Sequence, residues 1–417
     1  MSIPLSALDT PPARGRARPA LFPMMAVCSG ATVANVYLAQ PLLELFTRGL
    51  GVTAAAAGVV VTCAQFGYAA GILFLVPLGD VRRRRPLLSM LLAVTVIGLL
   101  LAAAAPGLTL LAAATALVGG ATVIPQVLVP LAAEFAPPQR RASVVAGVQI
   151  GLMTGIIGSR VIGGAVGDLF GWRAVYLLAA GLTAAAGAVT IALLPREARP
   201  TAYGAAMAAR PSYPALLASL PRLLFREPAL RHSCALHALL FGAYTATWTS
   251  LVLVLTREPY HYRSAVAGLF GALGLAGAVA APWAGRFVDR RGAVPIIAAA
   301  VALMLAAAGL YALGGTVLPC LILAIVLANV SVQWSQIANQ TRIFGYLPQA
   351  RSRANTVYMV AVFLSGAICA ALAAACYGAW GWLGVCALQA VLTVLALPVL
   401  PLARRYDRRH LTSQKEQ

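Results

Sequence analysis

The chain has 417 residues, of which 61% are apolar and only 10% are charged. Soluble globular proteins carry about 45–50% apolar and about 25% charged residues, so this composition excludes a soluble fold. The net charge is +20, but the basic residues form short clusters between long apolar runs, which argues against nucleic-acid binding. The sequence therefore predicts a helical membrane protein with many spans.

Twelve apolar runs are long enough to cross a bilayer as helices, which takes about 20 residues each. The runs are continuous and do not alternate with polar residues, so a transmembrane β-barrel is not expected. In chain order the expected spans are 21–45, 54–78, 86–105, 108–131, 143–166, 173–194, 231–254, 264–284, 293–313, 317–340, 354–377 and 380–402.

One connection is much longer than the others and contains six prolines between Pro195 and Pro228. It is the natural divide between two six-helix halves. The expected units are an N-terminal tail (1–20), an N-terminal six-helix bundle (21–194), a central loop (195–230), a C-terminal six-helix bundle (231–402) and a C-terminal tail (403–417).

The basic residues set the expected orientation, because cytoplasmic loops are enriched in Lys and Arg. With a cytoplasmic N-terminus, all of the 31 basic residues lie on or beside the cytoplasmic face except Arg48, Arg160, Arg173, Arg257 and Arg263. We therefore expect both termini in the cytoplasm and the chain in the inner membrane. The seven cysteines lie in apolar runs without metal-ligand spacing, so neither a metal nor a cofactor is expected.

Three sequence markers recur at nearly the same offset. The members of each pair are about 210 residues apart. The pairs are Asp80 in PLGDVRRRR with Asp289 in GRFVDRRG, Arg141 with Arg353, and Gly171-Trp172 with Gly381-Trp382. This offset predicts a parallel duplication of one six-helix unit.

With these loops the chain resembles the major facilitator superfamily of secondary transporters. That family has an acidic residue followed by basic residues between helices 2 and 3, and a weaker copy between helices 8 and 9. The second copy matches well here through Gly285, Asp289, Arg290 and Gly292, whereas the first departs at Val76, Val81 and Arg83. NVYLAQPLL from Asn35, GWRAVY from Gly171 and NQTRIFG from Asn339 are similar to bacterial members mostly labelled as exporters. The resemblance implies an all-α membrane protein with twelve transmembrane helices in two pseudo-symmetric six-helix bundles.

The chain departs from the drug/proton antiporter branch of that family in two places. The branch usually has an Arg within helix 4, where this chain offers Ala113, Thr115 and apolar neighbours. Its helix 5 usually carries a Gly-Pro signature, where this chain reads GIIGSRVIGG with Arg160 near the Pro position. Both departures weaken an assignment to proton-coupled drug efflux.

The resemblance also implies a cytoplasmic gate. Each loop carboxylate is expected near the N-terminus of a helix in the other half, where the helix dipole favours negative charge. The alternative is that these charges only fix the topology. The candidate gate residues are Asp80, Arg84, Glu134, Arg141, Asp289, Arg290 and Arg353.

Arg160 is the one basic residue inside a span without a role in topology. An ionisable side chain at that depth is expensive and indicates a functional site by default. Three interpretations stay open: contact with a substrate or coupling ion, an ion pair with Glu44, or snorkelling to the outer headgroups.

Polar stripes mark the expected binding surface. Asn329, Gln333, Gln336 and Gln340 share one helix face, and Gln149 shares a face with Arg160. The other candidates are Asn35, Tyr37, Gln40 and Glu44 on the first span and the aromatic residues Tyr68, Tyr244, Trp248 and Trp334. Hydrogen bonding between helices without a ligand is the alternative.

No nucleotide-binding, metalloprotease or serine-hydrolase motif is present, so an enzyme is not expected. The leading hypothesis is a monomeric transporter that exports a drug-like compound or metabolite by alternating access, coupled to protons. Without a carboxylate deep in a span, the proton carrier would be Glu44, Glu134, a histidine or the substrate. The alternatives are uptake, uniport or anion-linked exchange centred on Arg160, and a non-transporting membrane receptor or assembly factor.

Overall fold

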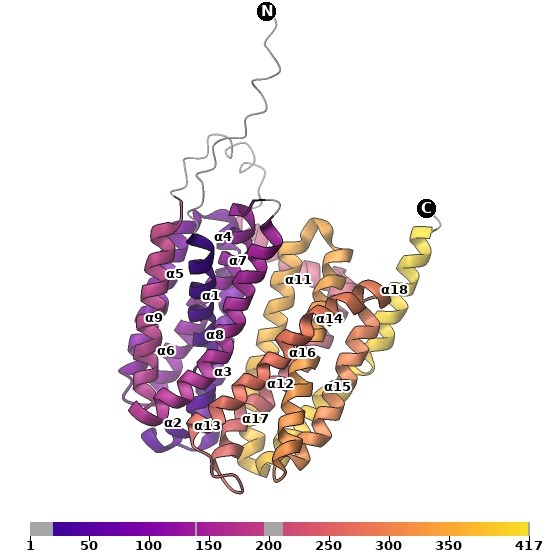
Figure 1. The fold of residues 1–417 in the computed structure, drawn as a ribbon. Coiled ribbons are helices and arrows are strands. Elements are labelled where there is room, and N and C mark those ends of the chain that lie inside the picture. The colour runs from indigo at the N-terminus through magenta and orange to yellow at the C-terminus, as the bar shows by residue number, and fades with distance from the viewer. Residues whose placement is uncertain (1–19, 138–139, 196–211, 416–417) are drawn as a thin grey trace, which may run out of the picture.

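The computed structural model describes residues 20–137, 140–195 and 212–415, and all of its regular secondary structure in these ranges is helical. Two helical halves lie side by side, the first indigo to magenta and the second orange to yellow in Figure 1. The helices of the first half are α1 (Leu21–Tyr37), η2 (Gln40–Leu42), α2 (Leu43–Leu50), α3 (Ala54–Phe74), α4 (Leu78–Val81), α5 (Arg84–Ala103), α6 (Leu108–Ala121), α7 (Ile124–Phe135), α8 (Arg141–Phe170) and α9 (Trp172–Leu193).

The second half follows the same plan. Its helices are α11 (Tyr213–Arg226), α12 (Pro228–Thr256), α13 (Ser264–Leu269), η4 (Phe270–Gly274), α14 (Leu275–Arg291), α15 (Ala293–Leu313), α16 (Leu318–Tyr346), η5 (Pro348–Ala350), α17 (Arg351–Ala396) and α18 (Val399–Lys415).

Ten helical segments of the described chain are long and apolar enough to cross a membrane, or eleven when α1 and the bent pair η2–α2 count as one span. One of the ten, 348–409, has 62 residues, which is about 93 Å of helix and three bilayer cores. It is interrupted at Gly381, whose backbone is not helical (φ 62°, ψ −152°). Divided there, it supplies two spans and brings the number to the expected twelve.

Gly171 and Gly381 show why the sequence repeat exists. Both have positive φ, 81° and 62°, a conformation that glycine adopts without strain. Each lets the chain turn sharply between the fifth and sixth span of its half. The 210-residue repeat of Gly-Trp is therefore a repeat of one backbone turn.

Small residues let helices of the first half approach closely. A Cβ atom on Gly155 of α8 would collide with the backbone of Gly30 on α1, and one on Gly151 would collide with Ala26. Such contacts replace the hydrophobic effect as the source of helix association in lipid. They hold α8, which carries Arg160, directly against α1.

The halves meet along α3 with α17 and along α8 with α13 and η4. Gly58 of α3 lies against Ala374 of α17, and Gly378 of α17 against Ala55. Along the same pair of helices, the ring centres of Tyr68 and Phe363 lie 4.5 Å apart.

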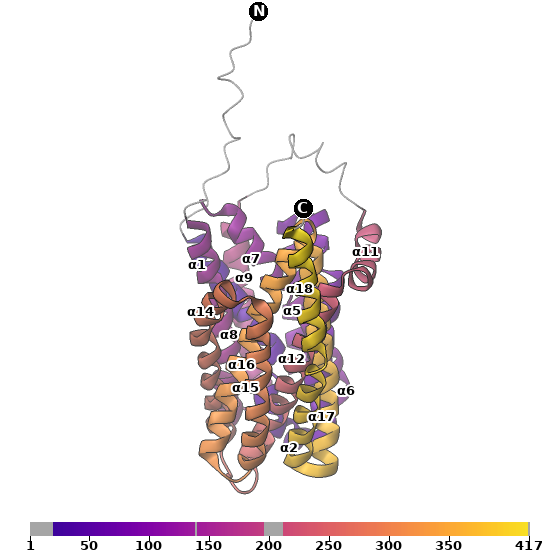
Figure 2. The same ribbon diagram turned by 90° about the vertical axis from the view of Figure 1, so that its right-hand side faces the viewer.

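Two surface helices add detail to the expected loop and tail. The central segment contains α11, which lies outside the bundle in Figure 2. The hydroxyl of Tyr213 in α11 donates to the carbonyl of Phe74 in α3 of the first half (2.6 Å). The C-terminal tail is the helix α18 as far as Lys415. The expected N-terminal tail and residues 196–211 of the central loop lie outside the described residues.

α18 is anchored by a buried arginine. Arg342 of α16 donates to Asp407 of α18 from Nη2 (2.8 Å) and Nε (3.1 Å), and to Ala229 and Ser233 of α12 from Nη1. The Arg342 side chain is only 1% exposed. This ion pair ties α18 to the second half.

We expect Asp407→Asn to destabilise the protein by about 3 kcal/mol, because it leaves a buried guanidinium without its counter-charge. The measurement is the midpoint of thermal unfolding in detergent. Asp289→Asn is the matched control, since Asp289 is exposed and forms no ion pair with a described residue; it should change stability by less than about 0.5 kcal/mol. Equal midpoints for both variants would contradict the anchoring role.

Candidate functional site

Two spans lose α-helical geometry at the level of Arg160. The first span bends by 43° between α1 and the η2–α2 pair, because Pro41 cannot donate a backbone hydrogen bond and its ring displaces the preceding turn. The eighth span passes through the 3₁₀ segment η4, which contains Gly271 and Gly274. Breaks of this kind inside a span are typical of binding sites and hinges.

Arg160 lies between these breaks and is 3% exposed. It donates to Oε1 of Gln40 in η2 from Nε (3.3 Å) and Nη2 (3.2 Å), and from Nη2 to the Tyr244 hydroxyl (3.5 Å). Gly271 allows η4 to cover the side chain, since a Cβ there would lie 2.7 Å from Cβ of Arg160. The guanidinium is thus enclosed by both halves.

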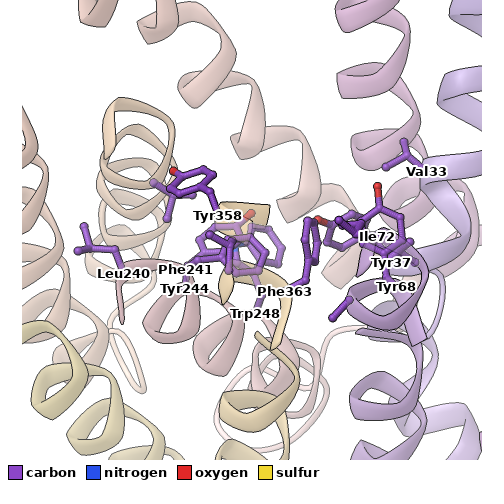
Figure 3. Close-up of a cluster of buried hydrophobic side chains, with 14 of the residues drawn as sticks. Val33, Tyr37, Tyr68, Ile72, Leu240, Phe241, Tyr244, Trp248, Tyr358 and Phe363 are labelled. Atoms are coloured by element: carbon purple, nitrogen blue, oxygen red, sulfur yellow. The ribbon is translucent and has the colours of Figure 1, made fainter. Parts of the chain in front are cut away.

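Aromatic rings form the walls around the guanidinium. Its Cζ lies 3.9 Å from the centre of the Trp248 ring and 5.4 Å from the Tyr37 ring. Figure 3 shows Tyr37 and Tyr68 of the first half near Phe363, Phe241, Tyr244 and Trp248 of the second. Cation–π contacts with Trp and Tyr stabilise a desolvated cation by about 2 kcal/mol. These rings therefore offset part of the cost of burying the guanidinium.

α16 of the second half also contributes a residue to the contacts around Arg160. The Tyr244 hydroxyl, which receives a hydrogen bond from Arg160, donates to Oδ1 of Asn329 (3.2 Å), whose amide nitrogen donates to the Ile325 carbonyl. Residues from α1, η2, α8, α12 and α16 therefore meet at one place. We call Tyr37, Gln40, Arg160, Tyr244, Trp248 and Asn329 the Arg160 site.

Other candidates lie along or away from this site. Gln333 and Gln336 are half-buried further along α16, and Gln149 is exposed on α8, about 16 Å from Arg160 along the helix. Gln340 donates to Asn355 of α17 (3.2 Å). Asn35 instead bonds within the first half, to Thr183 (3.2 Å), and does not join the Arg160 site.

The expected alternative of an ion pair between Arg160 and Glu44 is wrong for this structure. Glu44 accepts from Arg48 (3.0 Å) and lies 3.8 Å from Arg257, because the bend at Pro41 places it on the separate helix α2. Snorkelling is not observed either, since the guanidinium is buried among rings and amides. In the described part of the chain, Arg160 has no acidic partner.

Ion pairs across the halves occur at one end of the bundle. We call the end that carries Arg82–Arg85, Arg290 and Arg353 the basic end, and the other the opposite end. At the opposite end, Oδ2 of Asp168 on α8 accepts from the backbone nitrogen of Ala265 in α13 (2.6 Å) and lies 3.9 Å from Arg263. Glu44 and Arg257 form a second contact between the halves there. Sequence reasoning missed Asp168, because its partner is a backbone group.

At the basic end, the ion pairs of the described residues stay within one half. Arg84 pairs with Glu134 in the first half, and Arg342 pairs with Asp407 in the second. Asp289 and Arg290 are exposed, and Arg353 is half-buried. The side chains of the gate candidates Asp80 and Arg141 lie outside the described residues. The described ion pairs thus join the halves at the opposite end only.

Comparison with known proteins places the chain among transporters. Residues 25–349 match the family model of the Major Facilitator Superfamily. The chain is 47% identical over 382 residues to the "Probable transporter SCO4007" of Streptomyces coelicolor, with 91% of this chain and 87% of the relative covered. It is 36% identical over 381 residues to the "Uncharacterized transporter YgaY" of Escherichia coli O157:H7, with 91% and 95% covered. It is 27% identical over 392 residues to the "Inner membrane transport protein YnfM" of Escherichia coli K12, with 88% and 87% covered.

Solved structures share the fold at low identity. The nucleoside transporter NupG superposes with a TM-score of 0.72 at 14% identity, covering 92% of this chain and 99% of NupG. A bacterial homologue of the lysosomal transporter Spinster superposes with a TM-score of 0.67 at 14% identity, covering 92% and 96%.

Asp168→Asn should open the opposite end more often, because asparagine can still accept the bond from Ala265 but loses the negative charge that strengthens this bond and attracts Arg263, together worth about 1.4 kcal/mol. A cysteine at Ala374, buried against Gly58, reports this opening by its rate of maleimide labelling in a cysteine-free background. We expect a rise of about tenfold. Glu134→Gln, whose partner Arg84 lies in the same half, is the control; equal rates in both variants would contradict the closing role of Asp168.

Proposed function

The chain belongs to the major facilitator superfamily, and from this premise we propose that it exports a small organic solute by alternating access around Arg160. As a member of that family it is a secondary transporter in a membrane, not an enzyme. What we propose beyond this is the class of solute, the direction of transport and the driving force.

One observation carries the proposal. The Arg160 site takes Tyr37, Gln40 and Arg160 from the first half and Tyr244, Trp248 and Asn329 from the second. A site shared by two rigid halves changes its accessible side when the halves rock against each other. A scaffold or receptor has no need to assemble a charge from both halves, which disfavours the non-transporting alternative.

The distribution of basic residues supports a cytoplasmic basic end with both termini inside. In that orientation the opposite end, closed by Asp168, faces outward. The half-buried Gln333 and Gln336 and the exposed Gln149 lie toward the cytoplasm. The described state is then inward-facing, the state in which an exporter loads its solute, and the chain would act as a monomer in the inner membrane.

Proton coupling, which the sequence led us to expect, needs a group that titrates on the transport path. Glu44 and Glu134 each pair with arginine near the ends of the bundle, and His237 is buried against Ser335 (2.9 Å). We therefore favour the alternative in which transport centred on Arg160 proceeds without protons, by uniport or by anion-linked exchange.

Alternating access can be tested by locking the opposite end. A Cβ on Gly378 would lie 3.7 Å from Cβ of Ala55, a separation suited to a disulfide. In a cysteine-free background reconstituted into vesicles, oxidising Ala55→Cys/Gly378→Cys should abolish flux of a radiolabelled panel of organic anions, amides and amines, and reduction should restore it. Each single variant under the same oxidation is the control. Full flux through the cross-linked protein would overturn the proposal.

In the same vesicles we expect flux to be the same with and without a pH difference of one unit, because no carboxylate of the described residues contacts Arg160. The internal and external buffers set this difference, and an ionophore-clamped membrane potential keeps the electrical term constant. A severalfold acceleration by the proton gradient would contradict this expectation and favour proton-coupled efflux.

A further inference from the structure

We propose that the Arg160 site binds the carboxylate of a small aromatic monocarboxylate, with the ring of the solute against Trp248 and the neighbouring aromatic residues. This inference rests on the proposed function and names its class of solute.

Arg160 is buried, and no carboxylate of the described chain lies within ion-pair distance of it. Its hydrogen-bond partners, Gln40 and Tyr244, are neutral. A buried charge without a counter-ion is costly, so the site is completed when a ligand brings one negative charge.

Arg342 shows how this chain satisfies a structural arginine. Arg342 is equally buried, but it makes charge-assisted bonds of 2.8 and 3.1 Å to Asp407 and two further bonds of 2.7 and 2.9 Å from Nη1. The bonds of Arg160 are longer, 3.2–3.5 Å, and its Nη1 has no hydrogen-bond partner among the described residues. A carboxylate could therefore displace Gln40 or Tyr244 and form shorter, stronger bonds.

Nε1 of Trp248 is a buried donor without an acceptor, in a residue that is 4% exposed and whose ring lies 3.9 Å from Cζ of Arg160. Gln40 Oε1 already accepts two hydrogen bonds from Arg160, and Asn329 Oδ1 accepts one from Tyr244. The Trp248 donor and the guanidinium together suit the two oxygens of a carboxylate better than an ammonium group, which can only donate.

The ring centre of Tyr244 lies 5.9 Å from that of Trp248 and 6.1 Å from that of Phe241. The ring centre of Phe241 lies 5.3 Å from that of Phe363. Together with Tyr37 and Tyr68, these rings make a continuous aromatic layer (Figure 3). Aromatic pairs in offset or edge-on contact gain energy beyond the area they bury. With one guanidinium available, a monoanion with a planar ring is the best match.

A monoanion also has its own driving force for export. A membrane potential that is negative inside favours the outward movement of one negative charge. Such a solute leaves the cell without a coupled proton, which is consistent with a site that lacks a titrating carboxylate.

The test compares ligands that differ in charge or in the ring. Purified full-length protein is titrated calorimetrically with 2-naphthoate and benzoate (anions), 2-naphthamide and benzamide (neutral), benzylamine (cation) and acetate (no ring). We expect the carboxylates to bind at least tenfold more tightly than the matched amides, with 2-naphthoate tightest and acetate undetectable. Binding of the amides or of benzylamine as tightly as the carboxylates, or no binding of either carboxylate, would overturn the inference.

Two variants assign the binding to its residues. Arg160→Gln should remove the preference for carboxylate over amide, whereas Trp248→Phe, which keeps a ring but removes the Nε1 donor, should weaken carboxylate binding about fivefold and leave amide binding unchanged. Arg173→Gln is the matched control, since Arg173 also stacks on a tryptophan, Trp172 (4.1 Å). An unchanged carboxylate preference in both Arg160→Gln and Trp248→Phe would overturn the inference.

Failure of this inference and failure of the proposed function give different results. If the disulfide lock at the opposite end stops flux of an amide or amine while carboxylates neither bind nor move, alternating access stands and the solute class is wrong. If carboxylates bind but the lock leaves their flux unchanged, the site stands and the proposed function is wrong.

Discussion

The structure depends on one constraint: within a bilayer, every backbone N–H and C=O group must be bonded inside the protein. Continuous helices meet this constraint, and they make up nearly all of the described chain. The two 3₁₀ segments η2 and η4 are exceptions in the middle of spans, and both contact α8 near Arg160. The irregular backbone of η2 and η4 therefore lies where both halves cover it, and the same place holds the buried guanidinium.

The contacts between the halves are uneven along the bundle. Near the opposite end, helices touch through small residues such as Gly58 and Ala374, and Asp168 bonds a backbone nitrogen of the other half. Near the basic end, each described ion pair is internal to its half. Because the described ion pairs join the halves at the opposite end only, opening that end requires few polar contacts to break: the bond of Asp168 to Ala265 and the contacts of Arg257 and Arg263.

Much of the fold could be predicted from the sequence because a bilayer penalises polar residues strongly. Long apolar runs marked the spans, the Gly-Trp repeat marked the duplication, and the rarity of charge inside spans singled out Arg160. The partners of Arg160 were harder to predict. Counting depth along a straight helix placed Glu44 beside it, whereas the bend at Pro41 carries Glu44 to α2 and leaves Gln40 in that position. The anchor between Arg342 and Asp407 joins residues 65 apart, and no local pattern marks such a contact.

The unbroken helix α16 has a mechanical consequence. It carries Asn329 at the Arg160 site and Arg342 at the anchor of α18, 13 residues or about 20 Å apart along a stiff rod. Unlike the first and eighth spans, α16 has no 3₁₀ segment to absorb a shift between these two points. A displacement of Asn329 at the Arg160 site is therefore transmitted along α16 to Arg342 and α18. The C-terminal helix thus moves together with the site at the centre of the membrane.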